Sequence, residues 1–296
     1  MLCDVPEIDG SAGGGQLLRW ALTMSAVTER SFEMHGIRGA RDTPGLRPQH
    51  VAAVEAIGAL TEATTEGVEV GSERITFRPT RRPYGSVSVD IGTAGSIPLV
   101  FDTVLPLAAA IEDPVSVTAT GGTDVKWSPP IDYTRHVKLP LLSDLGIDAG
   151  IEVERRGFYP KGQGRARLTV EPSEVTQVDI TERGGIEKVS VHSVASTDLR
   201  DASVADRQAA TAEDELRGRV KAPVETSVSY DETASTGSVI VIAARFRDAA
   251  AGFNALGDPG SCGFIQVLPR WTRSGGRPPR RSTASIPRHR GWVCFN

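Results

Sequence analysis

Apolar runs, helical periodicities and turn residues follow one another in a fixed order along the first part of this chain. Leu17, Leu18, Ala21, Leu22 and Met24 recur with helical spacing and predict a helix over residues 16–28. A short apolar strand over 5–9 and a glycine-rich loop precede this helix. A second helix over 49–60 and two strands within 68–78, joined by a Gly-Ser turn, complete the unit.

The same order of elements recurs up to residue 170. The pattern predicts a strand, a helix, a strand, a helix and a strand pair over residues 87–91, 97–110, 115–119, 133–145 and 151–170. We therefore expect an α/β (α+β) fold, in which two βαβαββ units form a large domain over residues 1–179.

The pattern changes between residues 180 and 250. Apolar strands at 189–194 and 237–243 flank a polar helix over 201–220, and the connection over 227–237 has the composition of an exposed loop. We expect this region to form a small α/β domain inserted after the second unit.

Composition places the chain among globular proteins, with 39% hydrophobic and 24% charged residues in 296. No apolar run approaches the length of a bilayer span, and the first residues lack the pattern of a signal peptide. Three widely spaced cysteines form neither a disulfide framework nor a zinc pattern. We expect a cytoplasmic protein without a membrane partner.

The final segment, residues 261–296, differs from the rest. It holds seven of the 33 basic residues and no acidic residue, so the first 260 residues carry 26 basic against 37 acidic groups, a net charge of −11. The segment is either a disordered basic tail that touches nucleic acid or the product of a changed reading frame after about Pro259. The second explanation is favoured because basic tails are usually lysine-rich and rarely contain Trp and Cys.

Residues 36–50 form a turn-rich connection that concentrates cations. Pro44, Gly45 and Pro48 prevent a regular element across most of the segment. The segment brings together three arginines, an amide and an imidazole: Arg38, Arg41, Arg47, Gln49 and His50. Arginine forks bind phosphate oxygens in pairs, so we interpret this segment, called the arginine loop below, as an anion site. The alternative is a surface loop with scattered charge.

Five motifs together resemble the RNA 3'-terminal phosphate cyclase family over residues 5–260. They are Asp9-Gly-Ser-Ala-Gly-Gly-Gly-Gln16, the arginine loop, Gly92-Thr-Ala-Gly-Ser96, Gly121-Gly-Thr-Asp124 through Pro130, and Gly157-Phe-Tyr-Pro160. The resemblance implies three βαβαββ units with a small α/β domain before the third. The third unit would start at residues 251–260, directly before the unusual tail.

The resemblance also implies an ATP-dependent reaction at RNA 3' ends, with a divalent metal (Mg or Mn). A histidine takes AMP from ATP, the AMP passes to the RNA 3'-phosphate, and the neighbouring 2'-hydroxyl attacks to give a 2',3'-cyclic phosphate. The implied RNA and phosphate contacts are Arg19, Arg38, Arg41, Gln49 and His50. The implied nucleotide contacts are Gly13, Gly14, Gly15, Asp102, Pro129 and Pro130. Glycine at these three positions also has a physical explanation, because it lets the backbone approach an anion at the start of a helix.

Several positions depart from the family's pattern. The first loop lacks a glutamate, Thr43 stands where lysine is common, and Asp102 replaces a glutamine. The nucleophilic histidine, usually followed by Thr-Asn, is not found, and His289 has different neighbours. The catalytic residue and the metal ligands therefore remain unassigned. The alternatives are a non-catalytic RNA-binding or ribosome-assembly relative and, on weaker grounds, an enolpyruvyl transferase.

Overall fold

In the computed structural model, which describes residues 5–257, the first unit has the predicted βαβαββ order. Its elements are β1 (Glu7–Asp9), α1 (Gly15–Thr28), β2 (Phe32–His35), α2 (Pro48–Leu60), β3 (Thr64–Glu66) and β4 (Ile75–Arg78). The sheet has the order β1-β2-β4-β3, with β1 parallel to β2 and the other pairs antiparallel.

The second unit repeats this topology. Its elements are β5 (Gly85–Asp90), α3 (Ile97–Val104) with a 3-10 turn (Leu105–Ala109), β6 (Val115–Gly121), α4 (Ile131–Tyr133), a π-helical turn (Thr134–Lys138), α5 (Leu139–Asp144), β7 (Ala149–Arg155) and β8 (Gly164–Val170). The sheet order is β5-β6-β8-β7, again with one parallel pair followed by two antiparallel pairs. The predicted α/β class with repeated βαβαββ units is confirmed.

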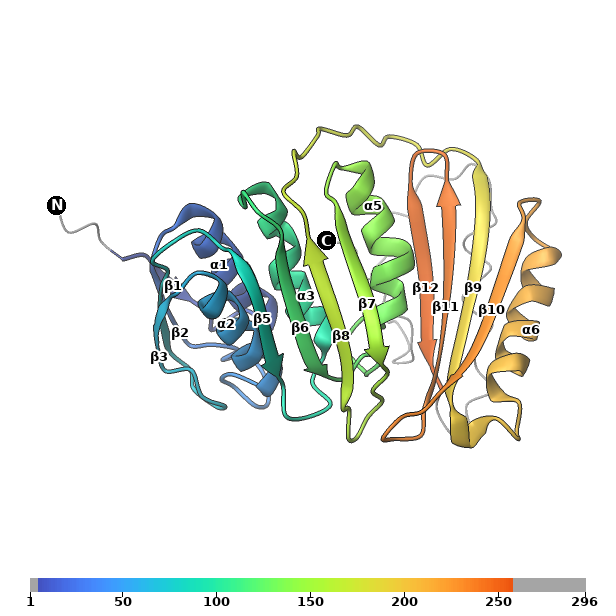
Figure 1. The fold of residues 1–296 in the computed structure, drawn as a ribbon, viewed down its shortest axis with the longest axis horizontal. Helices are drawn as coiled ribbons and strands as arrows, with labels where there is room; N and C mark the ends of the chain where they lie inside the picture. Colours follow the sequence, from blue (N-terminus) through green and yellow to red (C-terminus); the bar gives the residue numbers. More distant parts are fainter. Residues whose placement is uncertain (1–4, 258–296) are drawn as a thin grey trace, which may run out of the picture.

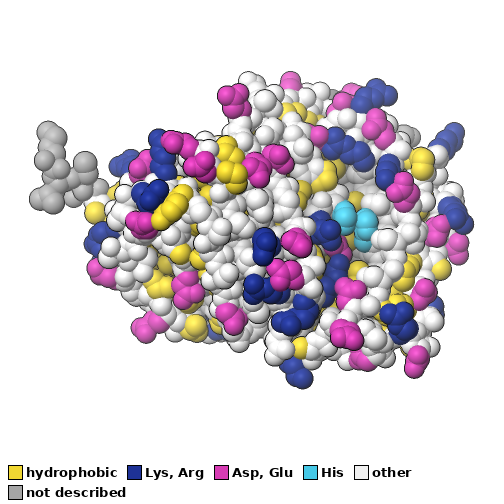
Figure 2. All heavy atoms as spheres, in the orientation of Figure 1, with side chains coloured by type: hydrophobic (Ala, Val, Ile, Leu, Met, Phe, Trp, Pro, Cys, Tyr) yellow, Lys and Arg dark blue, Asp and Glu magenta, His cyan; other side chains and the backbone are white. Residues whose placement is uncertain are grey.

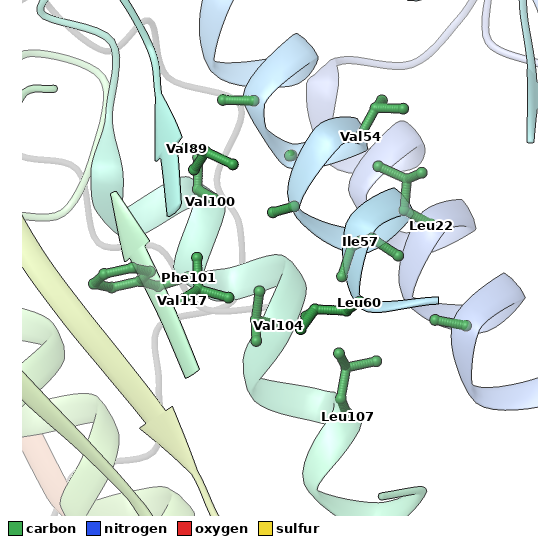
Figure 3. Close-up of a cluster of buried hydrophobic side chains, with 14 of the residues drawn as sticks. Leu22, Val54, Ile57, Leu60, Val89, Val100, Phe101, Val104, Leu107 and Val117 are labelled. Atoms are coloured by element: carbon green, nitrogen blue, oxygen red, sulfur yellow. The ribbon is translucent and has the colours of Figure 1, made fainter. Parts of the chain in front are cut away.

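Helices of the two units share one hydrophobic core. Helix α2 packs against α1, α3 and β5, and almost every residue that follows its first turn is apolar. Figure 3 shows Ile57 and Leu60 of the first unit pointing toward Val104 of the second, and Leu22 and Leu107 belong to the same cluster. Because this core contains buried residues of both units, the shared contact excludes water from both of them.

The described residues from Ile186 onward contain a separate sheet at the far end of the molecule from β1 (Figure 1). The elements of this insert are β9 (Ile186–Ser196), a 3-10 turn (Thr197–Leu199), α6 (Val204–Arg217), β10 (Val224–Asp231), β11 (Ser238–Phe246) and β12 (Ala250–Leu256). The strand order is β10-β9-β11-β12. Helix α6 covers one face, where Val191, Leu216 and Ile240 belong to a second hydrophobic cluster.

Three sequence predictions are corrected by the structure. Residues 68–70 are not a strand, because β4 pairs instead with residues 64–66 and the chain turns at Gly67 (φ 72°) and Gly71 (φ 90°). Residues 227–231 belong to β10 rather than to an exposed loop, because β10 pairs along its whole length with β9.

The third correction concerns the expected start of a third unit at residues 251–260. Strand β12 pairs antiparallel with β11, so the sheet of the insert continues to Leu256, beyond the predicted boundary at 250. Residues 258–260, the tail over 261–296 and His289 lie outside the described residues. Within residues 5–257, none of the helices combines the length and apolarity that a bilayer crossing requires.

Candidate functional site

The glycine-rich loop and the arginine loop meet at the first turn of α1. A Cβ atom on Gly14 would lie 3.0 Å from Nη2 of Arg41, and one on Gly15 would lie 2.0 Å from Nε2 of His50. Glycine at these positions therefore allows the two loops to touch. Helix α1 has no side-chain N-cap and no acidic residue in its first turn, so its N-terminal N–H groups and dipole favour an anion.

His50 is held as a neutral hydrogen-bond donor. Its side chain is 3% exposed, and its Nδ1 accepts the Arg47 backbone N–H at 3.0 Å. Burial, and then the charges of Arg19, Arg38 and Arg47, lower the pKa of His50 to about 3. Because Nδ1 is the acceptor, Nε2 carries the proton and faces Gly15.

Arg38 stabilises the arginine loop from within. Its backbone has φ 56°, and its Nη1 donates to the carbonyls of Thr43 at 2.7 Å and Gly45 at 2.8 Å. Burial and the charges of Arg47 and Arg41 lower the pKa of Arg38. The structure thus gives this residue a role in loop shape, beside the phosphate contact expected from the sequence.

The arginines of the site share an unusual electrostatic setting. In the part of the chain that the structure describes, the carboxylates form their ion pairs elsewhere, and none is made by Arg19, Arg38, Arg41 or Arg47. Burial lowers the pKa of Arg19, although the charge of Asp102 opposes this effect. Four cations gathered without a paired carboxylate suit a multiply charged anion.

Gln49 connects the arginine loop to the second unit. Its side-chain oxygen accepts the Ser96 backbone N–H at 3.2 Å, and the Ser96 hydroxyl is hydrogen-bonded to that of Ser128. The backbone N–H of Gly122 donates to the Gly95 carbonyl at 2.8 Å. Four of the five sequence motifs therefore form one contiguous group of loops.

The fifth motif joins this group through backbone contacts. Thr123 donates its N–H to the Gly157 carbonyl at 2.9 Å, and Asp124 forms an isolated β-bridge with Phe158. Of the expected nucleotide contacts, Pro129 is partly buried, whereas Pro130 is buried at the start of α4. Pro130 therefore presents little surface to a ligand.

Asp102 has a partner that the sequence did not reveal. Its Oδ1 accepts a hydrogen bond from Lys138 Nζ at 2.6 Å. The ammonium compensates the carboxylate, which lowers its repulsion of phosphate oxygens nearby. The two residues lie 36 positions apart, so no local pattern indicates their pairing.

A second charged cluster joins the second unit to the insert. Arg156 is buried and binds Asp124 at 3.0 Å, Asp132, and Asp231 of β10 at 3.0 Å. Burial raises the pKa of Asp124, although Arg156 opposes this effect. The ion pairs of Arg156 with Asp124 and Asp132 therefore stabilise the loop that follows β6.

Two histidines stack at the same border. The rings of His136 and His192 have centroids 3.8 Å apart, and burial followed by the charge of His192 lowers the pKa of His136 to about 4. Figure 2 shows histidine side chains on this face with Lys and Arg beside them. No local sequence pattern indicates this pair, because His136 and His192 belong to different units.

The described residues do not fit a metal held by protein side chains alone. Residues 5–257 contain no group of three or more His, Cys, Asp or Glu side chains placed to bind an ion. The candidate site therefore suits Mg²⁺ only where substrate phosphates supply most of the ligands of the ion.

Comparison with known proteins identifies close relatives. The family model for RNA 3'-terminal phosphate cyclase matches residues 11–273. The match extends past residue 260, where the resemblance drawn from the motifs ends. The RNA 3'-terminal phosphate cyclase of Halobacterium salinarum is 49% identical over 264 residues, covering 86% of this chain and 76% of that protein. The protein of the same name from Archaeoglobus fulgidus is 43% identical over 258 residues, covering 86% and 75%.

Among solved structures, the enolpyruvyl transferase NikO from Streptomyces tendae aligns with 73% of this chain and 38% of its own. Its TM-score is 0.30 and its sequence identity is 15%, values too low to support an argument about fold or function. The sequence matches to the cyclase family, in contrast, cover most of the chain and confirm the resemblance drawn from the five motifs.

Proposed function

The chain belongs to the RNA 3'-terminal phosphate cyclase family, and on that premise we propose that its site binds ATP and a phosphorylated RNA 3' end in the cytoplasm. The observation that carries this proposal is the group of four arginines near the first turn of α1, for which residues 5–257 provide no ion-paired carboxylate. An RNA 3'-phosphate and the phosphates of ATP are anions of the kind that such a group binds.

The reaction that we propose for the family has three steps, and this chain would supply phosphate contacts for it. A histidine attacks the α-phosphate of ATP and pyrophosphate leaves; the AMP then passes to an oxygen of the RNA 3'-phosphate and frees the histidine. The 2'-oxygen attacks the activated phosphorus, AMP leaves, and a 2',3'-cyclic phosphate remains. Arg19, Arg41 and the Nε2–H of His50 would hold phosphate oxygens, with Arg38 and Gln49 fixing the loop around them. A Mg or Mn ion is proposed only as a companion of the ATP phosphates, and no step is assigned to it.

We further propose that this chain does not form the adenylated histidine. His50 is unsuited to attack, because its Nδ1 accepts a hydrogen bond and its Nε2 carries the proton. None of the five histidines of the sequence is followed by Thr-Asn, and His289 lies outside the described residues.

The second candidate function is RNA-end binding without catalysis, as in a ribosome-assembly relative. It is favoured by the same observation, because a chain without the nucleophile keeps its anion site. An adenylation assay tests whether the chain forms the histidine adduct that the cyclase reaction requires. With labelled ATP and Mg or Mn, we expect no acid-labile adenylated protein, and strong labelling would contradict the missing nucleophile.

RNA-end binding is tested with two oligonucleotides that differ only at the 3' end. We expect single-stranded RNA with a 3'-phosphate to bind about tenfold more tightly than the 3'-hydroxyl form, equal to about 1.4 kcal/mol. Arg41→Glu should remove this preference. Arg30→Glu is the matched control, because Arg30 is exposed beyond the opposite end of α1. Equal binding of both oligonucleotides by the parent protein would refute the assignment.

A further inference from the structure

Two large aromatic side chains are exposed on the loops that border the candidate site. Trp127 is 81% exposed and Tyr159 is 73% exposed, the highest values among the exposed large hydrophobic residues described. Phe77 and Phe101 of the same units are fully buried in the core. Exposure of two rings on adjacent loops indicates a surface that contacts another molecule.

Hydrogen bonds and a β-bridge connect the loops that carry these two rings to the arginine loop. Trp127 precedes Ser128, whose hydroxyl binds Ser96, and Ser96 in turn binds Gln49. Tyr159 follows Phe158, which is bridged to Asp124 in the loop that carries Trp127. The rings therefore sit on a framework that is continuous with the anion site.

The conformation of Trp127 supports a role in binding. Its φ of 69° lies in the left-handed region, which bulky side chains rarely adopt. Non-glycine residues in this region occur mainly where the surrounding structure imposes the conformation, often at ligand-binding loops. Here the conformation places a large ring on the surface.

Lysine accompanies each of the two aromatic residues. Lys126 precedes Trp127, Lys161 is two positions after Tyr159, and both lysines are exposed. Neighbouring cations and aromatic rings are typical of surfaces that bind single-stranded nucleic acid, where bases stack and lysines contact phosphates. Such stacking accepts every base, because each base has a π-face.

We propose that Trp127 and Tyr159 form a stacking platform for unpaired bases at the 3' end of RNA. The proposal rests on the proposed function, in which the arginine loop binds the terminal phosphate, and it adds contacts to the bases. The high exposure of both rings favours an open RNA strand over the adenine of ATP, which needs an enclosing pocket.

The test measures binding of fluorescent single-stranded RNAs by anisotropy. Both RNAs end in a 3'-phosphate. One carries a base at every position, and the other has abasic residues at its last two positions. We expect the parent protein to bind the abasic RNA about tenfold more weakly, as loss of base stacking predicts. Trp127→Ala should bind both RNAs equally, whereas Trp127→Phe should retain most of the difference. Trp20→Ala is the control, because Trp20 is an exposed tryptophan on α1.

Each outcome has a separate meaning. If Trp127→Ala discriminates between the two RNAs as the parent does, the platform is refuted. If Trp127→Ala weakens ATP binding and leaves RNA binding unchanged, the ring contacts adenine and the proposal is also refuted. If the parent responds to abasic residues but not to the 3'-phosphate, the platform stands and the proposed role of the arginine loop fails.

Discussion

Acidification from pH 7 to pH 5 is expected to destabilise the folded protein through the side chain of His50. Burial and the neighbouring charges of Arg19, Arg38 and Arg47 lower its pKa to about 3 in the folded state. In the unfolded chain the pKa of histidine is near 6.5. Below that pH the unfolded state binds a proton that the folded state does not, so this contribution to stability is complete above pH 6.5 and is lost progressively toward pH 3.

The expected loss between pH 7 and pH 5 is about 2 kcal/mol, from linkage of a single proton with these two pKa values. Urea unfolding followed by circular dichroism at both pH values measures it. The comparison protein is His50→Gln, which does not titrate and whose amide oxygen can accept the Arg47 N–H, as glutamine does at this position of a capping box.

The parent protein should lose about 2 kcal/mol more than His50→Gln over this pH range. Carboxylates and other histidines titrate in both proteins, so the difference between the two curves isolates His50. Identical pH dependence of the two proteins would refute the description of His50 as a buried, neutral donor.

Three substitutions test other parts of the structure. Gly15→Ala places a Cβ 2.0 Å from Nε2 of His50 and should weaken binding of 3'-phosphorylated RNA about tenfold in the anisotropy assay. Arg156→Ala leaves two buried carboxylates without their cation and should cost about 3–5 kcal/mol in urea unfolding. Asp102→Asn removes a partly exposed pair with Lys138, and the cost by thermal unfolding should stay below about 1 kcal/mol.

Helices could be predicted from the sequence where apolar residues recur with helical spacing. The helices expected over 16–28 and 49–60 match α1 and α2 to within one residue at each end. Strand β3 was missed because the three residues of Thr64–Glu66 are polar and exposed, and only pairing with β4 makes them a strand. Strand β10 was missed for a similar reason, since its exposed polar residues gain their order from β9.

The same distinction applies to the site. The arginines of the arginine loop are neighbours in sequence, so their grouping could be predicted, although the bond from Arg38 to its own loop could not. The pair between Asp102 and Lys138 joins residues far apart along the chain. The bond from Arg156 to Asp231 spans 75 positions and depends on how the insert docks. Such contacts arise from tertiary packing and have no local signal.

The hydrophobic clusters divide the described residues into regions that we expect to unfold separately. One cluster contains residues of both βαβαββ units, so neither unit can lose its packing without exposing apolar surface of the other. The insert has a cluster of its own beneath α6. Hydrogen exchange should therefore resolve two cooperative units, with the amides of β9 and β11 exchanging as one group and those of β2 and β6 as another.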